Sequence, residues 1–246
     1  MKRLEIILFL FPLLFTSCDK EDAWDIIKTS GPVVTEEREV SSFSEIEVTD
    51  RINIILVQDT VEKIILSGPK NLLAKVSTTN NYSTLKIRDN NNFNWVRSFD
   101  NEIVATVHVK SLKKIYYEGV GNITSNNKLV SDSLIIISQQ SSGDINLSIA
   151  VDYFYCYFNQ SLVYMNLRGT ANRAHLQISG TGFLDCETLQ TINCSTQNQG
   201  SGDIIANCSN YFSGIIEGSG NVLFTGNPNQ TAFKYFGRGS GEFIEF

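Results

Sequence analysis

From residue 36 onward, short runs of alternating or consecutive apolar residues are separated by Gly, Asn, Asp and Ser. Such runs predict β-strands, because alternate residues of a strand face the same side. Helical periodicity is nearly absent, and only one helical turn is expected, around residues 71–76. The pattern therefore predicts an all-β fold. In the first half of the chain the expected strands cover 46–48, 52–57, 63–67, 84–88 and 103–109, and the expected long loop covers 89–100.

A short motif recurs from residue 119 onward. It is Gly-x-Gly, or Ser-Ser-Gly in one copy, followed mostly by Asn, Asp or Glu and then by an apolar residue. The second glycine recurs every 18 to 22 residues, except for one interval of 39 that contains a degenerate copy at 160–164. A fixed period of about twenty residues predicts stacked repeats. The expected corner glycines are Gly119, Gly121, Gly143, Gly180, Gly182, Gly200, Gly202, Gly218, Gly220, Gly239 and Gly241.

Each repeat is expected to form one turn of a parallel β-solenoid, a β-helix-like stack in which strands pair with their equivalents above and below. Glycine suits the corners because it adopts positive φ readily and because it leaves room where turns stack closely. An apolar residue always lies two positions after the second glycine, which predicts an inward-facing column: Ile123, Ile145, Leu184, Ile204, Val222 and Phe243. A second inward set precedes the corners: Ile136, Cys156, Ile178 and Cys194. We expect the solenoid to cover 116–246 and to continue from an N-terminal β-sheet segment at 36–115.

The N-terminus has the pattern of an export signal. Lys2 and Arg3 precede an apolar run over 6–15 that is too short to cross a bilayer as a helix. Thr16 and Ser17 then lie directly before Cys18, which resembles a bacterial lipobox. We therefore expect a lipoprotein signal peptide at 1–17, acylation of Cys18, and a tether over 18–35. An ordinary signal peptide with a chance cysteine is the alternative.

Acylation of Cys18 would make the membrane a partner of this chain through its N-terminal lipid. The charged run over 19–22 resembles the signals that send Bacteroidetes-type lipoproteins to the outer face of the outer membrane. The resemblance implies an outer-membrane lipoprotein on the cell surface. A solvated tether without that meaning, and an orientation toward the periplasm, stay open.

The repeated G-x-G-[ND]-[IV] pattern resembles the head GIN domain family, also called putative auto-transporter adhesins. The leader over 43–48 and the segment over 107–115 that precedes Gly119 fit the same family, and the resemblance covers about 36–246. It implies a β-solenoid lipoprotein or secreted protein with an adhesive role and no defined catalytic residues. The chain departs from the pattern at 160–162, where the glycines are missing, so a reshaped corner is expected there.

Several kinds of chemistry are not indicated. The formal net charge of −6 and the scattered Lys and Arg argue against nucleic acid as a partner. Repeat carboxylates lie on mostly non-adjacent turns, and we interpret them as corner residues that hydrogen-bond their own backbone. No metal, no cofactor and no catalytic residue is expected. Four further cysteines, Cys156, Cys186, Cys194 and Cys208, are interpreted as free buried thiols, with disulfides left open.

The best candidate binding surface is aromatic. If Phe154, Cys156 and Phe158 face inward, then Tyr153, Tyr155 and Tyr157 point outward and adjoin Ile135 or Ile137 of the previous turn. An exposed apolar and aromatic patch commonly marks a partner surface, and tyrosine rings suit sugars or proteins. Alternatively, loops or the N-terminal sheet cover these residues.

The sequence thus predicts a non-enzymatic surface adhesin that presents a β-solenoid face to a glycan or a surface protein, with oligomers possible. One alternative is a polysaccharide-active β-helix enzyme, which would need at least three acidic or basic side chains to converge in one groove. Another is a scaffold that faces the periplasm.

Overall fold

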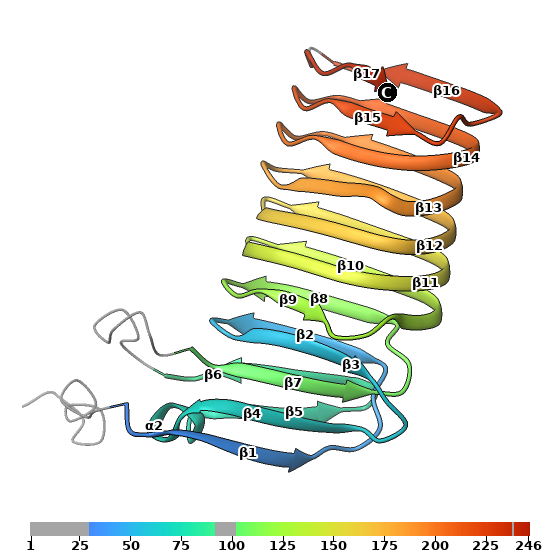
Figure 1. Cartoon of the computed structure of the whole chain (residues 1–246). Helices are drawn as coiled ribbons and strands as arrows, with labels where there is room; N and C mark the ends of the chain where they lie inside the picture. Colours follow the sequence, from blue (N-terminus) through green and yellow to red (C-terminus); the bar gives the residue numbers. More distant parts are fainter. Residues whose placement is uncertain (1–29, 92–101, 238) are drawn as a thin grey trace, which may run out of the picture.

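The structure, a computed structural model, describes residues 30–91, 102–237 and 239–246 (Figure 1). The predicted signal peptide at 1–17, the predicted acylation site Cys18 and most of the loop expected at 89–100 lie outside these residues. Within them nearly every element is a strand, which confirms the all-β class. The first half contains β1 (Val33–Glu39), β2 (Glu45–Asp50), β3 (Asn53–Gln58), β4 (Lys63–Pro69), α2 (Lys70–Leu73), β5 (Val76–Asn81), β6 (Thr84–Asp89), β7 (Val104–Val109), β8 (Lys114–Gly119) and β9 (Ile123–Ser125).

The second half contains the long strands of the repeats. They are β10 (Leu129–Gln139), β11 (Ser142–Asn159), β12 (Leu162–Ser179), β13 (Phe183–Asn198), β14 (Ile204–Ile216), β15 (Val222–Thr225), β16 (Gln230–Tyr235) and β17 (Phe243–Glu245). Successive repeats pair in parallel, so the predicted parallel β-solenoid is confirmed.

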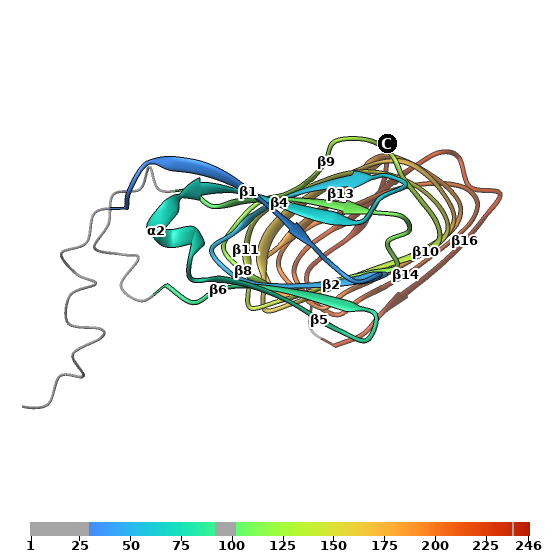
Figure 2. The ribbon, with the colours of Figure 1, turned by 90° about the horizontal axis from the view of Figure 1, so that it is seen from below.

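Each turn of the solenoid has two flat faces (Figure 2). The long strands β11 to β14 bend through nearly a whole turn, so the first part of each lies on one face and the last part on the other. We call the front face the one toward the viewer in Figure 1, formed by β4, β7, β3, β9, the first parts of β11 to β14, β15 and β17. The back face consists of β5, β6, β2, β8, β10, the last parts of β11 to β14, and β16.

The N-terminal segment belongs to the same stack. The turn made by β2 and β3 pairs in parallel with β8 and β9 above it and with β6 and β7 below it (Figure 1). Two antiparallel pairs, β1 with β4 and β5 with β6, close this end of the solenoid. The predicted continuity between the N-terminal segment and the solenoid is therefore confirmed. Residues 33–35, which we expected in the tether, pair with β4 as part of β1.

The predicted inward column exists and is longer than expected. Consecutive strand pairings join one residue from each turn, and all of them are buried except the last, Phe243, which is half-buried. The degenerate repeat contributes Met165 to this column. The column runs through Ile54, Ile123, Ile145, Met165, Leu184, Ile204, Val222 and Phe243.

The second predicted inward set is buried, but it does not form a single column. Ile136 pairs with Cys156, whereas Ile178 pairs with Phe158, two positions further along the strand. Cys194 pairs with Ala174, in the column on the other side. The repeats carry three inward columns on the back face, and the sequence spacing alone did not separate them.

Clearance between turns explains the corner glycines. A Cβ on Gly200 or Gly202 would lie closer than 3.0 Å to the carbonyl oxygen of the equivalent glycine one turn earlier, Gly180 or Gly182, and real Cβ atoms do not approach so closely. The same holds at the next two turns, for Gly218 and Gly220 and then for Gly239 and Gly241. Positive φ, the other reason expected, applies among the motif glycines with described geometry only to Gly143, whose φ is 119°.

Positive φ occurs instead at the corners that lack the Gly-x-Gly motif. Gln140 and Gln160 have φ of 47° and 51°, and they lie directly before Ser141 and Ser161. The hydroxyls of Ser138, Ser141 and Ser161 form one buried hydrogen-bonded cluster at this place. The reshaped corner expected at 160–162 is present, and its serine side chains fill space inside the turn.

The polar residue after the second glycine connects the turns. The backbone N–H of Asn221 donates to Asp203 Oδ1 (2.6 Å), and the N–H of Glu242 donates to Asn221 Oδ1 (3.1 Å). Lower in the stack, the N–H of Asp144 donates to Asn122 Oδ1 (2.9 Å). We expected such side chains to bind their own backbone, but those of Asn122, Asp203 and Asn221 accept from the equivalent residue of the next turn. A regular stack makes this possible, because equivalent residues lie one strand spacing apart.

Aromatic rings fill the C-terminal end of the solenoid. Phe212 stacks on Phe224 at 4.7 Å between ring centroids, and Phe233 stacks on Phe243 at 4.2 Å. Tyr235 and Phe236 are 62% and 54% exposed, because no further turn of the described chain covers them. Among the described residues, no helix is long and apolar enough to cross a membrane.

The close approach of the turns at the corner glycines predicts that one added methyl group lowers the stability of the fold. We expect Gly202→Ala to lower the free energy of unfolding by about 1–3 kcal/mol, because the new Cβ must displace the backbone of Gly182. The matched control is Ser219→Ala at the exposed middle position of a neighbouring motif, which should change stability by less than about 0.5 kcal/mol. Thermal and denaturant unfolding measure both. Equal stability of the two variants would contradict the clearance argument.

Candidate functional site

The tyrosine surface consists of Tyr153, Tyr155, Tyr157, Ile135 and Ile137. In the parallel register of β10 and β11, Ile135 lies beside Tyr155 and Ile137 lies beside Tyr157. All five residues are partly exposed on the back face, whereas the intervening residues Phe154, Cys156 and Phe158 are fully buried. The alternation therefore places the side chains as the sequence predicted. Whether they bind a partner stays a prediction.

The N-terminal strands lie beside the tyrosine surface and not over it. On the back face β8 pairs with β10 in parallel, and β2 pairs with β8 on the far side. The strands thus continue the same face toward the N-terminal end. The alternative that the N-terminal sheet covers the tyrosines does not hold for the described strands.

Three outward columns extend the tyrosine surface toward the C-terminal end. Their members pair from turn to turn, so equivalent side chains lie above one another. The first column is Ser133, Tyr153, Arg173, Asn193, Tyr211 and Gln230; the second is Ile135, Tyr155, His175, Ser195, Ser213 and Ala232; the third is Ile137, Tyr157, Gln177, Gln197, Ile215 and Lys234.

A stacked ring pair joins the second and third residues of the second column. The rings of Tyr155 and His175 are parallel to within 3° and 5.4 Å apart, and His175 Nδ1 lies 2.7 Å from Ser195 Oγ. Burial lowers the pKa of His175 below its usual value, so the imidazole is neutral at pH 7. Burial also raises the pKa of Tyr155, which stays protonated. The pair is an uncharged aromatic platform with a hydroxyl beside it.

Arg173 lies at the border of the tyrosine surface. Its guanidinium is 3.3 Å from Asp152 Oδ2 and 5.5 Å from the centre of the Tyr153 ring. Hydrogen bonds from Asn172 and then from Arg173 lower the pKa of Asp152, so the carboxylate is ionised at neutral pH. Both members of the ion pair are more than half exposed, so the pair contributes little to stability. Its effect is to neutralise Arg173 next to the tyrosines.

Two adjoining cavities lie on the back face beyond the ring pair. One has a volume of about 300 Å³ and the other about 270 Å³, and both are lined by His175, Ser195, Tyr211 and Ser213. The first also includes Tyr153, Arg173 and Asn193, and the second includes Gln197, Ile215 and Lys234. Neither cavity has an Asp or Glu in its described lining. The two together form an open groove with a mixed apolar and polar lining, which contains no carboxylate among its described residues.

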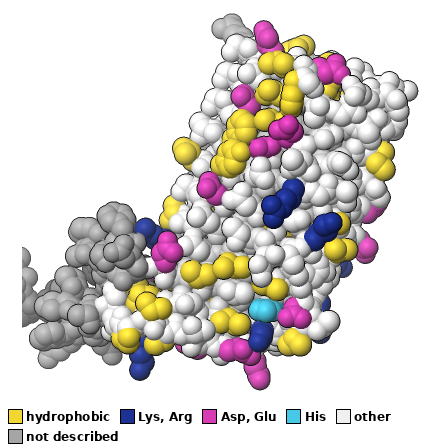
Figure 3. All heavy atoms as spheres, in the orientation of Figure 1, with side chains coloured by type: hydrophobic (Ala, Val, Ile, Leu, Met, Phe, Trp, Pro, Cys, Tyr) yellow, Lys and Arg dark blue, Asp and Glu magenta, His cyan; other side chains and the backbone are white. Residues whose placement is uncertain are grey.

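The front face differs in charge and holds an apolar band that sequence reasoning missed. Figure 3 shows hydrophobic side chains in a diagonal band on the upper turns, with acidic side chains among them. The rings of Tyr164 and Phe183 stack at 5.4 Å between ring centroids. Further along the stack, Ile205 on β14, Leu223 on β15 and Ile244 on β17 pair with one another in register. The signal was available, because these three aliphatic residues each lie three positions after a second glycine. The acidic residues of these turns are Asp144, Asp185, Glu187, Asp203, Glu242 and Glu245.

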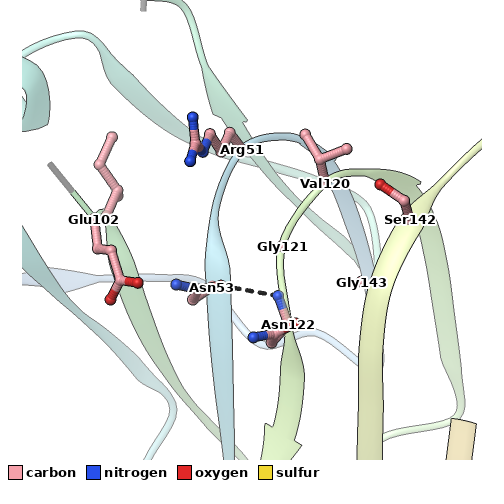
Figure 4. Close-up of a pocket in the computed structure, with 9 residues that line it drawn as sticks. Arg51, Asn53, Glu102, Val120, Gly121, Asn122, Ser142 and Gly143 are labelled. Atoms are coloured by element: carbon pink, nitrogen blue, oxygen red, sulfur yellow. Dashed lines mark hydrogen bonds between the residues drawn. The ribbon is translucent and has the colours of Figure 1, made fainter. Parts of the chain in front are cut away.

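A third cavity lies at a glycine corner near the N-terminal half (Figure 4). It has a volume of about 170 Å³, and its charged lining residues are Arg51 and Glu102. The backbone N–H of Asn122 donates to Asn53 Oδ1 (2.8 Å) at its wall. Sequence reasoning missed this cavity, because Arg51 and Glu102 are distant in the sequence. They line one cavity only because β3 pairs with β7 and β9.

The cavities offer no pair of carboxylates of the kind that a glycosidase would use. A glycosidase needs two carboxylates across one site, and Glu102 is the only Asp or Glu that lines any of the three cavities within the described residues. The groove on the back face is lined by three basic side chains, Arg173, His175 and Lys234, which reaches the number set for the enzyme alternative, but its described lining has no carboxylate to act with them. The described part of the chain also contains no group of three or more His, Cys, Asp or Glu side chains placed to hold a metal ion.

The four cysteines are packing residues. Cys156, Cys186, Cys194 and Cys208 are buried free thiols, in agreement with the interpretation from sequence. Burial raises the pKa of Cys156 to about 12 and raises the pKa of Cys186 and Cys194 as well. These three thiols therefore stay protonated and unreactive at neutral pH.

Comparison with known proteins gives one family and several solved structures. The family model described as "Putative auto-transporter adhesin, head GIN domain" matches residues 42–228. Among solved structures, a protein from Bacteroides fragilis NCTC 9343 described as a putative adhesin aligns with a TM-score of 0.81 at 23% identity, covering 87% of this chain and 97% of that one. The search of curated proteins finds no match.

Two further solved structures have the same fold at lower similarity. A protein from Parabacteroides distasonis ATCC 8503 described as a putative lipid binding protein aligns with a TM-score of 0.63 at 18% identity, over 88% of this chain and 97% of that one. A protein from Parabacteroides merdae ATCC 43184 described as a putative adhesin aligns with a TM-score of 0.56 at 17% identity, over 88% and 97%. At these identities the likeness shows the shared fold alone.

Proposed function

Because the chain belongs to the family of putative auto-transporter adhesins with a head GIN domain, we propose that it is a lipid-anchored adhesin of the cell envelope that binds a glycan or protein partner through the tyrosine surface. The family's description as putative adhesins supports a role at the cell envelope or surface. The lipid anchor, the outer-membrane location and the binding surface are our additions.

The observation that carries the proposal is the outward tyrosine row in register with two isoleucines. Tyr153, Tyr155 and Tyr157 stay partly exposed although alternate residues of the same strand are fully buried. A folded domain that needed these rings only for packing would turn them inward. Tyrosine combines a large apolar ring with a hydroxyl, which suits a partner with both apolar and polar surface.

The arrangement of the chain supports the anchor. Acyl chains on Cys18 would hold a soluble domain at a membrane stably if at least two are attached. Fourteen residues separate Cys18 from β1, and a chain of this length reaches about 50 Å when fully extended. β1 lies at one end of the stack and β17 at the other (Figure 1), so the tether enters at the N-terminal end. The solenoid and its back face then extend away from the bilayer.

Substitution of two tyrosines tests the binding surface. We expect Tyr155→Ser combined with Tyr157→Ser to weaken adhesion to glycan-coated or matrix-protein-coated surfaces at least tenfold, because it removes two of the three rings of the tyrosine surface. The melting temperature should change little, since both side chains point outward. Adhesion of cells that display the full chain, together with melting of the purified protein, gives the result.

The matched control for the tyrosine variant is Ile205→Ser combined with Leu223→Ser in the apolar band of the front face. It removes similar apolar area and should leave adhesion unchanged. A loss of adhesion in the control alone would move the binding site to the front face. Loss of stability in the tyrosine variant with full adhesion would make the tyrosines packing residues.

The anchor has its own test. We expect Cys18→Ala to abolish incorporation of labelled fatty acid and to move the protein from the membrane fraction to the soluble fraction. Protease treatment of intact cells should degrade the wild-type protein, because we propose that it faces outward. Survival of the wild type under protease would favour the scaffold that faces the periplasm. Membrane retention of the variant without label would contradict the lipid anchor.

A further inference from the structure

We propose that the back face binds linear, uncharged glycan chains lengthwise, in a groove that runs along the solenoid axis from the Tyr155–His175 ring pair to Ala232. The inference rests on the proposed function, because it assigns a ligand class and an orientation to the same face. It adds residues of β12, β13, β14 and β16 to a site that the sequence placed on β10 and β11.

The groove has a floor of side chains that become smaller toward the C-terminal end. His175, Ser195, Ser213 and Ala232 pair from turn to turn in one column, so each turn contributes one floor residue. The two adjoining cavities of about 300 and 270 Å³ lie over this floor. Longer side chains of the columns on either side form the walls: Arg173, Asn193 and Tyr211 on one side, and Gln197, Ile215 and Lys234 on the other.

The repeat distance of the groove fits a sugar chain. Neighbouring strands of a sheet lie about 4.8 Å apart, so equivalent side chains recur at that distance along the axis. This distance is close to the length of one pyranose ring in an extended polysaccharide. A linear glycan that lies along the axis can therefore present one sugar to each turn and meet similar groups at every step.

The chemistry of the lining fits an uncharged sugar. A pyranose has apolar C–H faces and polar hydroxyl edges. The Tyr155–His175 pair and the 40% exposed ring of Tyr211 offer flat aromatic surfaces for the faces. Asn193, Gln197 and Ser213 offer donors and acceptors for the hydroxyls. The imidazole is neutral, and Arg173 is already paired with Asp152, so the groove between the rings and Ser213 holds little net charge, and the positive charge of Lys234 lies at its C-terminal end.

The direction of the groove disfavours a peptide. An extended peptide usually adds to the exposed edge of a sheet, where it gains backbone hydrogen bonds. This groove crosses the strands, whose backbone groups are already paired with the turns above and below. It therefore offers only side chains.

A bulky residue on the groove floor tests the inference. We expect Ser213→Trp to weaken binding to an uncharged linear polysaccharide at least tenfold, because the indole fills the groove without entering the core. Ser148→Trp is the matched control, since Ser148 is a partly exposed, outward-facing serine on the front face. The probes are an immobilised β-glucan, a xylan and a mannan, with polygalacturonate as the anionic comparison, tested against the purified mature lipoprotein in detergent.

Chain length tests the orientation. Soluble fragments of the polysaccharide that binds should gain affinity with each added sugar up to about four units, one for each floor residue, and little beyond. Affinity that is already maximal for a disaccharide would show crosswise binding and overturn the lengthwise arrangement. Equal melting temperatures of Ser213→Trp and Ser148→Trp would show that both variants are folded.

The outcomes separate this inference from the proposed function. If Ser213→Trp binds like the wild type while the double tyrosine variant has lost binding, the groove is wrong and the tyrosine surface stands. If the wild type binds polygalacturonate alone, the ligand is anionic and the uncharged class is overturned. If the wild type binds none of the four polysaccharides but still adheres to matrix proteins or to lipid vesicles through the tyrosines, the glycan assignment fails.

Discussion

The turns of this protein approach each other so closely at one corner that a carbonyl oxygen of one turn occupies the space where the next turn would carry a Cβ. Gly202 over Gly182 and Gly220 over Gly202 are the clearest cases. The absence of side chains there lets the backbone of one turn follow that of the turn below it, and the strand residues that follow the corner then pair in register from turn to turn. The inward column from Ile54 to Phe243 and the polar ladder through Asp203 and Asn221 both depend on that regular stacking. One steric constraint therefore positions the core and the corner hydrogen bonds together.

The same regularity organises the surface. Because equivalent residues lie above one another, an outward residue type that recurs from turn to turn produces a continuous column, and two such columns with a smaller column between them produce a groove. On the back face this places rings, amides and hydroxyls in rows, while the front face holds aliphatic and acidic side chains. The fold has no separate domain for binding. Its candidate site is formed by outward side chains on a regular backbone, and that backbone is shared by solved structures of 17–23% identity.

Much of the fold could be predicted from the sequence, because a period of about twenty residues and an apolar residue at a fixed offset leave few architectures. The tyrosine row was predictable for the same reason, since alternation on one strand determines which face a residue takes. The groove was not predictable in this way. It requires the register between β12, β13 and β14, and that register contains bulges near Asn166 and Cys186 that no periodicity reveals. The cavity at Arg51 and Glu102 depends on a non-sequential pairing of β3 with β7, and the reason for the corner glycines became clear only from the distances between turns.

The most direct test of the stacked turns is to cross-link neighbouring turns in register. Gln177 and Gln197 are direct partners in β12 and β13, and directly paired strand residues lie within the Cα separation that a disulfide allows. Gln177→Cys with Gln197→Cys should form an intramolecular disulfide on mild oxidation of the folded protein. Gln177→Cys with Ser195→Cys, displaced by two residues along the strand, should form little disulfide, because the displacement takes the two Cα atoms beyond the separation that a disulfide allows. The native thiols are buried and should not compete in either variant. Efficient cross-linking of the displaced pair and none of the direct pair would contradict the account.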